Sequence, residues 1–361
     1  MNIAIIGAGP IGGYAAYLLQ KGGHSVSLYE EHGYVGCPIQ CTGLLTSDFD
    51  QFGLPMESFL VNTFSKIEVF SPHQHASIGQ KEYLVDRTKF DQFFVHLAVE
   101  EGAKLLLNHS FIKRESQSII IRNSLTKEEV IVTPDIVIAA DGPLSKTAKA
   151  YGLYHAQRQN YLGIQATVEG NFDPSTYQTY FGQETCPGLF AWIVPESKTI
   201  ARVGLGTLKD TKRYFDTFMT EKGFKALDIQ AGLIPLYHSK QVLHRENCYL
   251  LGDAAGFVKA TTLGGLIPGL KQAECLAQSI LEKKEYEQTV KPLHRRLQLH
   301  LHLQRILSKI NDEDWDRLVT YINQPRIKKV LAKHTRDNPF PLVVKTLLKE
   351  PRLLYFGKYL F

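Results

Sequence analysis

The 361-residue sequence lacks several features that define other classes of protein. No apolar run approaches the ~18 residues that a membrane-spanning helix needs. The first predicted strand begins at residue 2, which leaves no room for a signal peptide. We find no internal repeat, no low-complexity tract and no nucleic-acid-binding motif. With 44% hydrophobic and 21% charged residues, the composition favours a globular cytoplasmic protein.

Cysteine is also scarce, and its placement argues against both a disulfide framework and a metal site. The five cysteines are an odd number, and Cys186, Cys248 and Cys275 are scattered. Cys37 and Cys41 lie close together, but no second pair of ligands lies near them, so we predict no metal site. We expect free thiols in a reducing compartment. A disulfide between Cys37 and Cys41 is the alternative.

The first thirty residues carry the strongest motif. An apolar strand over residues 3–6 leads into the sequence Gly-Ala-Gly-Pro-Ile-Gly, a helix follows, and a second strand over residues 25–29 ends in an acid. In a dinucleotide-binding unit the glycines allow a tight turn, admit a pyrophosphate and let helix and strand pack closely. The alternative is an ordinary βαβ unit with a glycine-rich turn. The predicted cofactor contacts are Gly7, Gly9, Ile11, Gly12 and Glu30.

A second half-motif lies far along the chain. A strand over residues 248–251 is followed by Gly252 and Asp253, and Gly264-Gly265 opens a helix. The Asp253 carboxylate is suited to hydrogen-bond a ribityl or ribose chain. The backbone amides of Gly265 and Leu266 at a helix start would stabilise negative charge on a reduced flavin ring. Together the two half-motifs describe FAD and not NAD.

Two loops between these half-motifs supply further candidate contacts. Gly, Pro and Cys rule out regular structure over residues 36–44, so Cys41, Thr42 and Gly43 are predicted to form a loop near the nucleotide. Cys41 either faces the cofactor or is a structural thiol. Asp141 and Gly142 follow a strand over residues 135–140. Ligands of open α/β sheets bind at that edge.

A helix predicted to end near residue 101 begins close to Arg87. An acid would be preferred in its first turn, so a phosphate- or adenine-facing role explains Arg87 better than a solvent-facing one.

The remaining chain predicts two more regions. Short aromatic and β-branched segments over residues 161–206 indicate an antiparallel sheet, in which Phe190, Trp192 and Tyr180 either form core or line an apolar groove. The segment from residue 291 to the end holds 15 basic and 6 acidic residues. It predicts a helical cap docked on the fold, a membrane anchor, or both.

The predicted fold is therefore α/β, with a Rossmann-like FAD-binding domain, an inserted antiparallel-sheet substrate domain and a C-terminal helical region. The boundaries follow from the motifs. The FAD-binding domain is discontinuous, over 1–155 and 248–285. The substrate domain covers 156–247, and the basic helical region covers 286–361.

These residues resemble the geranylgeranyl reductase family, within the flavoproteins built like p-hydroxybenzoate hydroxylase, as far as about residue 281. The discriminating segments are a cysteine loop over residues 40–44, a P-x-x-Y-x-W-x-F-P-like motif over 187–195, and a flavin segment over 253–262. Three residues depart from the family pattern. Phe190 replaces a tyrosine, Val194 replaces a phenylalanine, and Leu263 stands where glycine is common.

The resemblance implies reduction of isolated C=C bonds in prenyl chains by reduced FAD. In archaea such enzymes saturate the geranylgeranyl chains of membrane lipids, and relatives act on chlorophyll or quinone side chains. An isolated alkene needs a hydride from flavin N5 and a proton. Phe190 and Trp192 are the candidates for shaping the groove and stabilising cationic character, and Cys41 is the candidate gate or proton relay.

The expected partners are a prenylated lipid, the membrane surface and an external electron donor. No second dinucleotide fingerprint is visible, so ferredoxin or another reductant is expected to supply electrons. A twenty-carbon chain costs roughly 16 kcal/mol to move into water, so the enzyme would draw its substrate from the bilayer as a peripheral protein.

Three alternatives remain. The first is a flavin monooxygenase or halogenase on the same fold, although only residues 192–195 approach the W-x-W-x-I-P signature of halogenases. The second is a non-catalytic prenyl-lipid carrier, which would not need both flavin half-motifs. The third is an electron-transfer flavoprotein with an iron–sulfur domain, which the cysteine spacing excludes.

Overall fold

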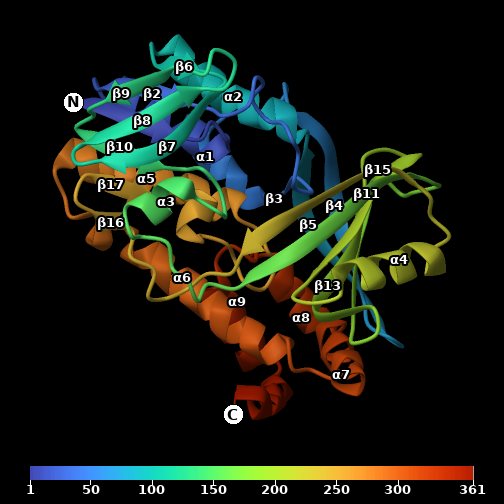
Figure 1. Ribbon diagram of the computed structural model, residues 1–361. Coiled ribbons are helices and arrows are strands. Elements are labelled where there is room, and N and C mark those ends of the chain that lie inside the picture. The colour runs from blue at the N-terminus through green and yellow to red at the C-terminus, as the bar shows by residue number, and fades with distance from the viewer. Residues whose placement is uncertain (361) are drawn as a thin grey trace.

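A computed structural model describes residues 1–360 and contains two large sheets with helices packed around them (Figure 1). The first sheet has six strands in the order β16-β17-β10-β1-β2-β6, parallel except for β16. The bounds are β1 (Asn2–Ile6), β2 (Ser25–Tyr29), β6 (Lys104–Leu106), β10 (Ile136–Ala139), β16 (His244–Arg245) and β17 (Cys248–Leu250).

Continuous apolar runs explain why this sheet is parallel and central. All four residues of β10 are buried, as are four of the five in β1, which is typical of strands covered on both faces. Helix α1 (Pro10–Lys21) packs against both α2 (Arg87–Glu100) and α5 (Leu266–Glu282) beside it. The strands predicted over 3–6, 25–29 and 248–251 are confirmed to within a residue at each end.

The second sheet has eight strands in the order β15-β11-β14-β13-β12-β4-β5-β3, antiparallel except between β12 and β4. The four strands predicted between residues 161 and 206 are all present, as β11 to β14. The bounds are β3 (Leu44–Thr46), β4 (Leu60–Phe70), β5 (His75–Val85), β11 (Asn160–Glu169), β12 (Thr176–Gly182), β13 (Cys186–Pro195), β14 (Ile200–Thr207) and β15 (Ala226–Pro235).

The second sheet also takes three strands, β3, β4 and β5, from the range 1–155 that the sequence assigned to the first domain. Alternating polarity shows that a segment is a strand but not which sheet it joins, and β4 pairs with β12 across more than a hundred residues. The boundaries of the three domains stay a prediction.

Smaller elements complete the two lobes. A third sheet of β7 (His109–Glu115), β8 (Ser118–Asn123) and β9 (Glu129–Val132) lies next to the first one (Figure 1). The remaining helices before the C-terminal region are η1 (Ser47–Phe52), α3 (Lys146–Ala150), α4 (Thr211–Glu221) and η2 (Gly252–Ala255).

The C-terminal region is helical, as predicted, including the segment whose leucines alternate with period two. Helix α6 (Tyr286–Leu307) runs beneath the first sheet, and α7 (Asp312–Ile322), α8 (Pro325–Leu331), α9 (Pro339–Lys349) and η3 (Pro351–Leu360) follow it (Figure 1). Helices α7 and α8 contact β5, and we call α7, α8 and α9 the cap. Within residues 1–360, no helix is long and apolar enough to cross a membrane.

Candidate functional site

A cavity of about 1020 Å³ lies between the two sheets and the cap. Every residue that the sequence singled out for the site lines this one cavity. They are Gly7, Gly9, Ile11, Gly12, Glu30, Cys41, Thr42, Gly43, Arg87, Asp141, Gly142, Phe190, Trp192, Asp253, Gly264, Gly265 and Leu266. The structure therefore brings together segments up to about 260 residues apart, while the role of each residue stays a prediction.

The three glycines of the N-terminal turn differ in what surrounds them. A Cβ at Gly7, where φ is +102°, would lie 2.4 Å from the Ala140 carbonyl oxygen. A Cβ at Gly12 would lie 2.1 Å from the Gly7 carbonyl oxygen. A Cβ at Gly9 would meet nothing within 4 Å, and no side chain caps helix α1 there. Gly7 and Gly12 are therefore required by the fold, whereas Gly9 leaves open space for an anion at a helix N-terminus.

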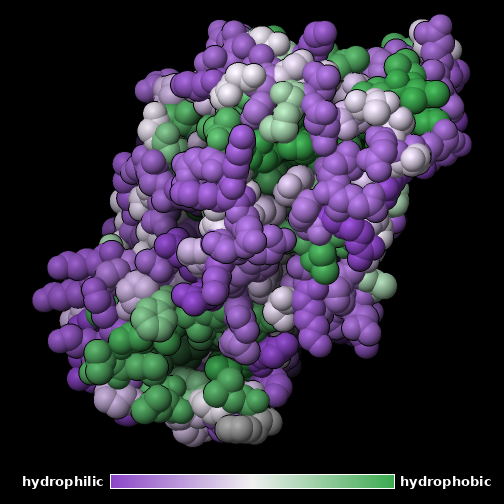
Figure 2. Space-filling model, turned by 90° about the vertical axis from the view of Figure 1, so that its left-hand side faces the viewer, coloured by the Kyte–Doolittle hydropathy of each residue, from purple (hydrophilic) through white to green (hydrophobic). Residues whose placement is uncertain are grey.

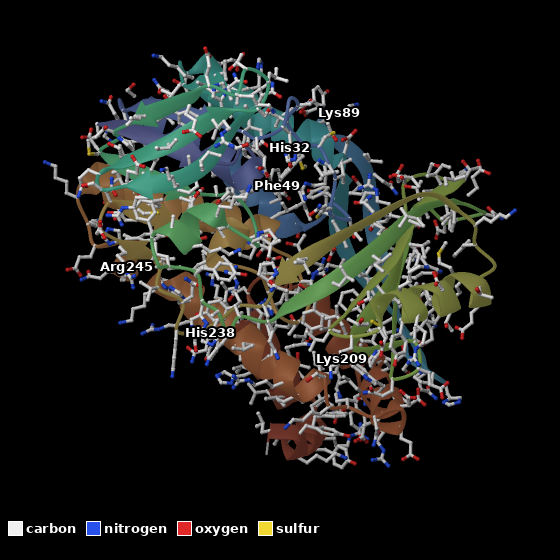
Figure 3. The ribbon with its side chains drawn as sticks, viewed as in Figure 1. His32, Phe49, Lys89, Lys209, His238 and Arg245 are labelled. Carbon is white, nitrogen blue, oxygen red and sulfur yellow. The ribbon has the colours of Figure 1, made fainter. Side chains whose placement is uncertain are left out.

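Glu30 ends β2 with its carboxylate held by the local backbone. Its Oε2 accepts a hydrogen bond from the Ala8 amide at 2.9 Å, and its Oε1 accepts one from the His32 amide at 3.0 Å. His32 lies on the side of the first sheet that faces the second sheet (Figure 3). His32 Nδ1 also lies 2.6 Å from Oε1, so the carboxylate is oriented and Oε2 keeps a lone pair that is able to accept a hydrogen bond from a ribose hydroxyl.

The second half-motif presents unsatisfied polar groups to the cavity. No hydrogen bond from residues 1–360 reaches the Asp253 carboxylate. Burial raises the pKa of Asp253, and the charges of Arg87 and Arg158 oppose that rise. Helix α5 begins at Gly265 without a side-chain cap. The Asp253 carboxylate thus offers free acceptors, and the amides at the start of α5 offer free donors. A dinucleotide with a polar sugar chain would satisfy both.

Leu263 occupies the position where the family commonly has glycine, and its backbone shows why glycine is preferred. Its φ is +54°, in the left-handed region that disfavours residues with a Cβ. A bridge between Lys259 and Gly264 closes the turn that contains Leu263.

Arg87 is buried at the cavity and does not face bulk solvent. Its Nε and Nη2 donate to the Asp91 carboxylate at 2.9–3.1 Å. Burial alone would lower the pKa of Arg87, but Asp91 and the neighbouring Cys41 side chain raise it above its ordinary value overall. Arg87 therefore carries a fixed positive charge next to Cys41, and its predicted contact with the cofactor stays a prediction.

Asp141 lines the cavity with its carboxylate already engaged. The Ser145 hydroxyl and the Thr147 amide both donate to it, the latter at 3.0 Å, and this arrangement orders the start of α3. Burial raises the pKa of Asp141. The neighbouring Gly142 has a φ of +77°, so it makes the turn away from β10.

The cysteine loop is braced by a buried arginine. Arg202 donates to the carbonyl oxygens of Thr42 and Val85, and the Gly43 amide donates to Cys41 Sγ at 3.3 Å. All five cysteines are free thiols, as expected, so the alternative disulfide between Cys37 and Cys41 is not formed. Within residues 1–360, no group of His, Cys, Asp or Glu side chains is arranged to hold a metal ion.

Gln165 ties the cysteine loop to the aromatic motif. Thr42 Oγ1 donates to Gln165 Oε1 at 2.6 Å, and Trp192 Nε1 donates to the same oxygen at 3.0 Å. The indole crosses β14 above Gly204, where a Cβ would lie 2.7 Å from a ring carbon of Trp192. The sequence analysis missed Gln165, because a glutamine in a strand carries no motif.

Of the three aromatic residues considered as groove or core, two line the cavity. The Phe190 and Trp192 rings meet edge to face with centroids 6.0 Å apart. Tyr180 points to the opposite face of the sheet, where it stacks on Phe70 at 4.7 Å beneath Lys222. Tyr180 is therefore core, as the alternation of side chains along β12 requires.

Replacing Gln165 with leucine should leave two half-buried donors, on Thr42 and Trp192, without an acceptor. A fully buried unsatisfied donor costs about 1–3 kcal/mol, so we expect Gln165→Leu to lower the free energy of unfolding by about 1 kcal/mol or more. Gln165→Glu, which keeps an acceptor, is the control. Chemical unfolding measures stability. Equal stability of the two variants would contradict the shared-acceptor role.

Beyond Trp192 the cavity continues as an apolar arm between the second sheet and the cap. The ring of Trp315 on α7 packs against Phe181 at 4.5 Å across the arm. No sequence motif marked the cap residues as part of the site. The other apolar residues of this arm are Ile67, Val69, Ile78, Val194, Leu307, Leu318, Val319, Ile322, Leu331 and Leu342.

His300 on α6 is buried beside the flavin segment in a way that predicts acid sensitivity. Its Nδ1 lies 2.7 Å from Thr261 Oγ1, and its Nε2 has no partner within residues 1–360. Burial, assisted by the charge of Lys259, lowers the pKa of His300 to about 3.

The unfolded chain protonates this imidazole below pH 6.5, so it binds more protons than the folded chain between pH 3 and 6.5. Between pH 7 and pH 5, we expect the wild type to lose about 2 kcal/mol more unfolding free energy than His300→Gln. Urea unfolding at both pH values measures this. Parallel losses in the two proteins would contradict it.

Comparisons with known proteins agree with this geometry. The profile of the geranylgeranyl reductase catalytic domain matches residues 160–234, and that of the NAD(P)-binding Rossmann-like domain matches residues 5–51. The chain is 27% identical over 390 residues to a digeranylgeranylglycerophospholipid reductase of Methanocaldococcus jannaschii, covering 99% of this chain and 97% of that protein.

Solved structures share the fold. A geranylgeranyl bacteriochlorophyll reductase-like protein from Thermoplasma acidophilum superimposes with a TM-score of 0.83 at 20% identity, covering 100% of this chain and 99% of that one. A flavin-dependent halogenase gives a TM-score of 0.69 at 14% identity, covering 98% of this chain and 77% of the halogenase.

The Rossmann-like sheet, the second curled sheet and the shared cavity define an oxidoreductase of the class built like FAD-dependent hydroxylases. Within that class, the catalytic-domain match over residues 160–234 and a relative 27% identical over nearly the whole chain make the geranylgeranyl reductase family the one that this chain resembles.

Proposed function

We propose that this protein is an FAD-dependent reductase that saturates C=C bonds in the geranylgeranyl or related prenyl chains of membrane lipids. One observation carries the proposal: a single cavity has a cradle of glycines and acids at one end and the apolar arm at the other. The cradle consists of Gly7, Gly9, Gly12, Glu30 and Asp253. Cys41 and Trp192 line the same cavity. A dinucleotide and a long hydrocarbon chain would meet there.

The cradle residues fit FAD. The open space at Gly9 and the amides of α1 would receive the pyrophosphate, and Glu30 would accept hydrogen bonds from the ribose. The unpartnered Asp253 carboxylate would bind the ribityl chain, and the amides at the start of α5 would face the ring. When bound and reduced, FAD supplies a hydride.

The alkene also needs a proton on its other carbon. Partial protonation gives tertiary cationic character, which an aromatic face stabilises by ~0.5–2 kcal/mol per ring. Phe190 and Trp192 present such faces to the cavity. The Cys41 side chain, beside the Arg87 charge, is the proposed proton relay or gate.

A prenyl lipid would reach the cavity from the bilayer, so we propose peripheral binding at the cytoplasmic membrane surface. Figure 2 shows a hydrophobic patch at the C-terminal end of the molecule. Exposed Lys345 and Lys349 lie on α9 together with exposed apolar side chains. The exposed large apolar residues of α9 and η3 are Phe340, Val344, Leu348, Leu354, Tyr355 and Leu360.

We expect co-sedimentation with anionic liposomes that weakens in salt, because each Lys or Arg near an anionic surface contributes ~1 kcal/mol. Replacing Phe340, Leu348 and Leu354 together by serine should abolish sedimentation, whereas Leu125→Ser, at another exposed apolar residue, should not. Wild-type protein that stays in the supernatant at low salt would contradict membrane binding.

The function is tested by incubating the purified protein, chemically reduced FAD and a geranylgeranyl phospholipid without oxygen. Mass spectrometry of the lipid should show the gain of two hydrogens for each reduced bond. An unchanged lipid would contradict the proposal. Oxygen consumption that depends on the lipid would instead support a monooxygenase. A physiological donor, ferredoxin or another reductant, would replace the chemical reductant.

A further inference from the structure

The loop between α8 and α9 carries a buried acid that bridges three parts of the fold. Asp337 Oδ1 lies 2.5 Å from Lys259 Nζ, and the two side chains are only 4% and 6% exposed. Asp337 Oδ2 accepts a hydrogen bond from Thr46 Oγ1 at 2.6 Å. Lys259 belongs to the flavin segment before α5, and Thr46 ends β3. One carboxylate thus joins the cap to the cofactor side and to the second sheet.

The preceding residue makes a second buried bridge. Both terminal nitrogens of Arg336 pair with the Glu82 carboxylate, one at 2.7 Å, and Nη1 also donates to Tyr177 Oη at 3.1 Å. Glu82 is fully buried on β5. Thr46 and Glu82 are directly opposite one another on β3 and β5. The adjacent loop residues Arg336 and Asp337 therefore bind Glu82 and Thr46, which lie opposite each other on β5 and β3.

Three buried charges, on Glu82, Lys259 and Asp337, and the half-buried Arg336 are an unusual way to hold a helix pair in place. Removing charges from water costs about as much as their attraction returns, so apolar residues of similar size would hold the cap at least as firmly. Charged side chains differ from apolar ones because water solvates them again when the contact between the cap and the rest of the fold opens. The loop that carries them connects the cap residues Leu331 and Leu342, which line the apolar arm. Fixing this loop therefore fixes one wall of the arm.

We propose that Arg336 and Asp337 form a reversible latch that holds the cap over the apolar arm, with Glu82 and Lys259 as its anchors. The cap separates from the second sheet at this latch to admit the hydrocarbon chain. The latch itself is independent of the proposed function, whereas its role in admitting a prenyl chain rests on that function.

Hydrogen exchange of the full-length protein tests the latch. Asp337→Ala leaves Lys259 buried and unpaired, so amides of residues 312–349 should exchange about tenfold faster while those of β1 and α1 keep their rates. The double variant Lys259→Met/Asp337→Leu replaces the pair by apolar side chains and should return cap exchange to the wild-type rate or below. Lys212→Met, which breaks an exposed pair with Asp216 on α4, is the control and should change nothing in the cap.

Unchanged exchange in the cap of Asp337→Ala would overturn the latch. Exchange that becomes equally faster in β1 and α1 would also overturn the latch, because general destabilisation of the fold gives that result. If the chain enters through the latch, the apolar double variant should show several-fold lower kcat/KM for phospholipid in vesicles, measured per bound flavin. An unchanged kcat/KM would overturn that role. If the wild type reduces no lipid, the proposed function fails while the exchange result still decides the latch.

Discussion

Gly9→Val yields a folded protein that does not retain FAD. The valine side chain has room in the protein, because a Cβ at Gly9 meets nothing within 4 Å, and it enters the space assigned to the pyrophosphate. Excluding the phosphates from the start of α1 removes several charge-assisted hydrogen bonds, and we expect the affinity for FAD to fall about a thousandfold or more, roughly 4 kcal/mol. Fluorescence titration of the apoprotein with FAD measures the loss.

Gly79→Val is the matched control for this substitution. Gly79 lies on β5, is exposed, has nothing within 4 Å of its Cβ position, and does not line the cavity. The Gly79→Val variant should bind FAD with the same affinity as the wild type. The apo forms of both variants should unfold within a few degrees of the wild-type apoprotein. FAD affinity of Gly9→Val within about fivefold of the wild type would show that the pyrophosphate lies elsewhere.

Cys41→Ala keeps its FAD and loses most of its turnover. A side chain that transfers a proton in the transition state typically contributes 10²–10⁴-fold, so we expect a fall in kcat of about that size. Cys37→Ala, in the same loop but exposed, should retain full activity. The measurement is anaerobic lipid reduction at matched flavin content, and full turnover by Cys41→Ala would remove this thiol from the mechanism.

The glycine turns and acidic residues at one end of the cavity could be predicted because their signals are local in sequence. Gly7, Gly9, Gly12 and Glu30 lie within one βαβ unit, and Asp253 lies near the glycines that open α5. Each of these residues is defined by what its own turn requires, such as the positive φ of Gly7. Family resemblance added proposed catalytic roles for Cys41 and Trp192, which line the same cavity.

The substrate end could not be predicted because its contacts join distant segments. Gln165 and Thr42 are 123 residues apart, and Asp337 and Lys259 are 78 residues apart. Nothing in the sequence near Asp337 distinguishes a buried ion pair from an acid on a solvated helix end. The pairing of β4 with β12 likewise follows from tertiary packing and not from strand propensity.

The basic composition of the C-terminal region predicted a docked helical cap, a membrane anchor, or both, but not which charges are engaged. Arg336 is bound to the fully buried Glu82, and Trp315 and Leu331 line the cavity. The exposed apolar residues of α9 and η3 are the part that still fits a membrane. One helical region therefore encloses the apolar arm and presents the proposed membrane surface.

The most direct test of the account is anaerobic reoxidation of the reduced flavin by lipid. The holoprotein is reduced chemically, excess reductant is removed, and a geranylgeranyl phospholipid is added while the flavin absorbance is recorded. We predict that the oxidised flavin spectrum returns and that the lipid gains two hydrogens for each flavin reoxidised. A flavin that stays reduced with the lipid, or a purified protein that binds no flavin, would contradict the account.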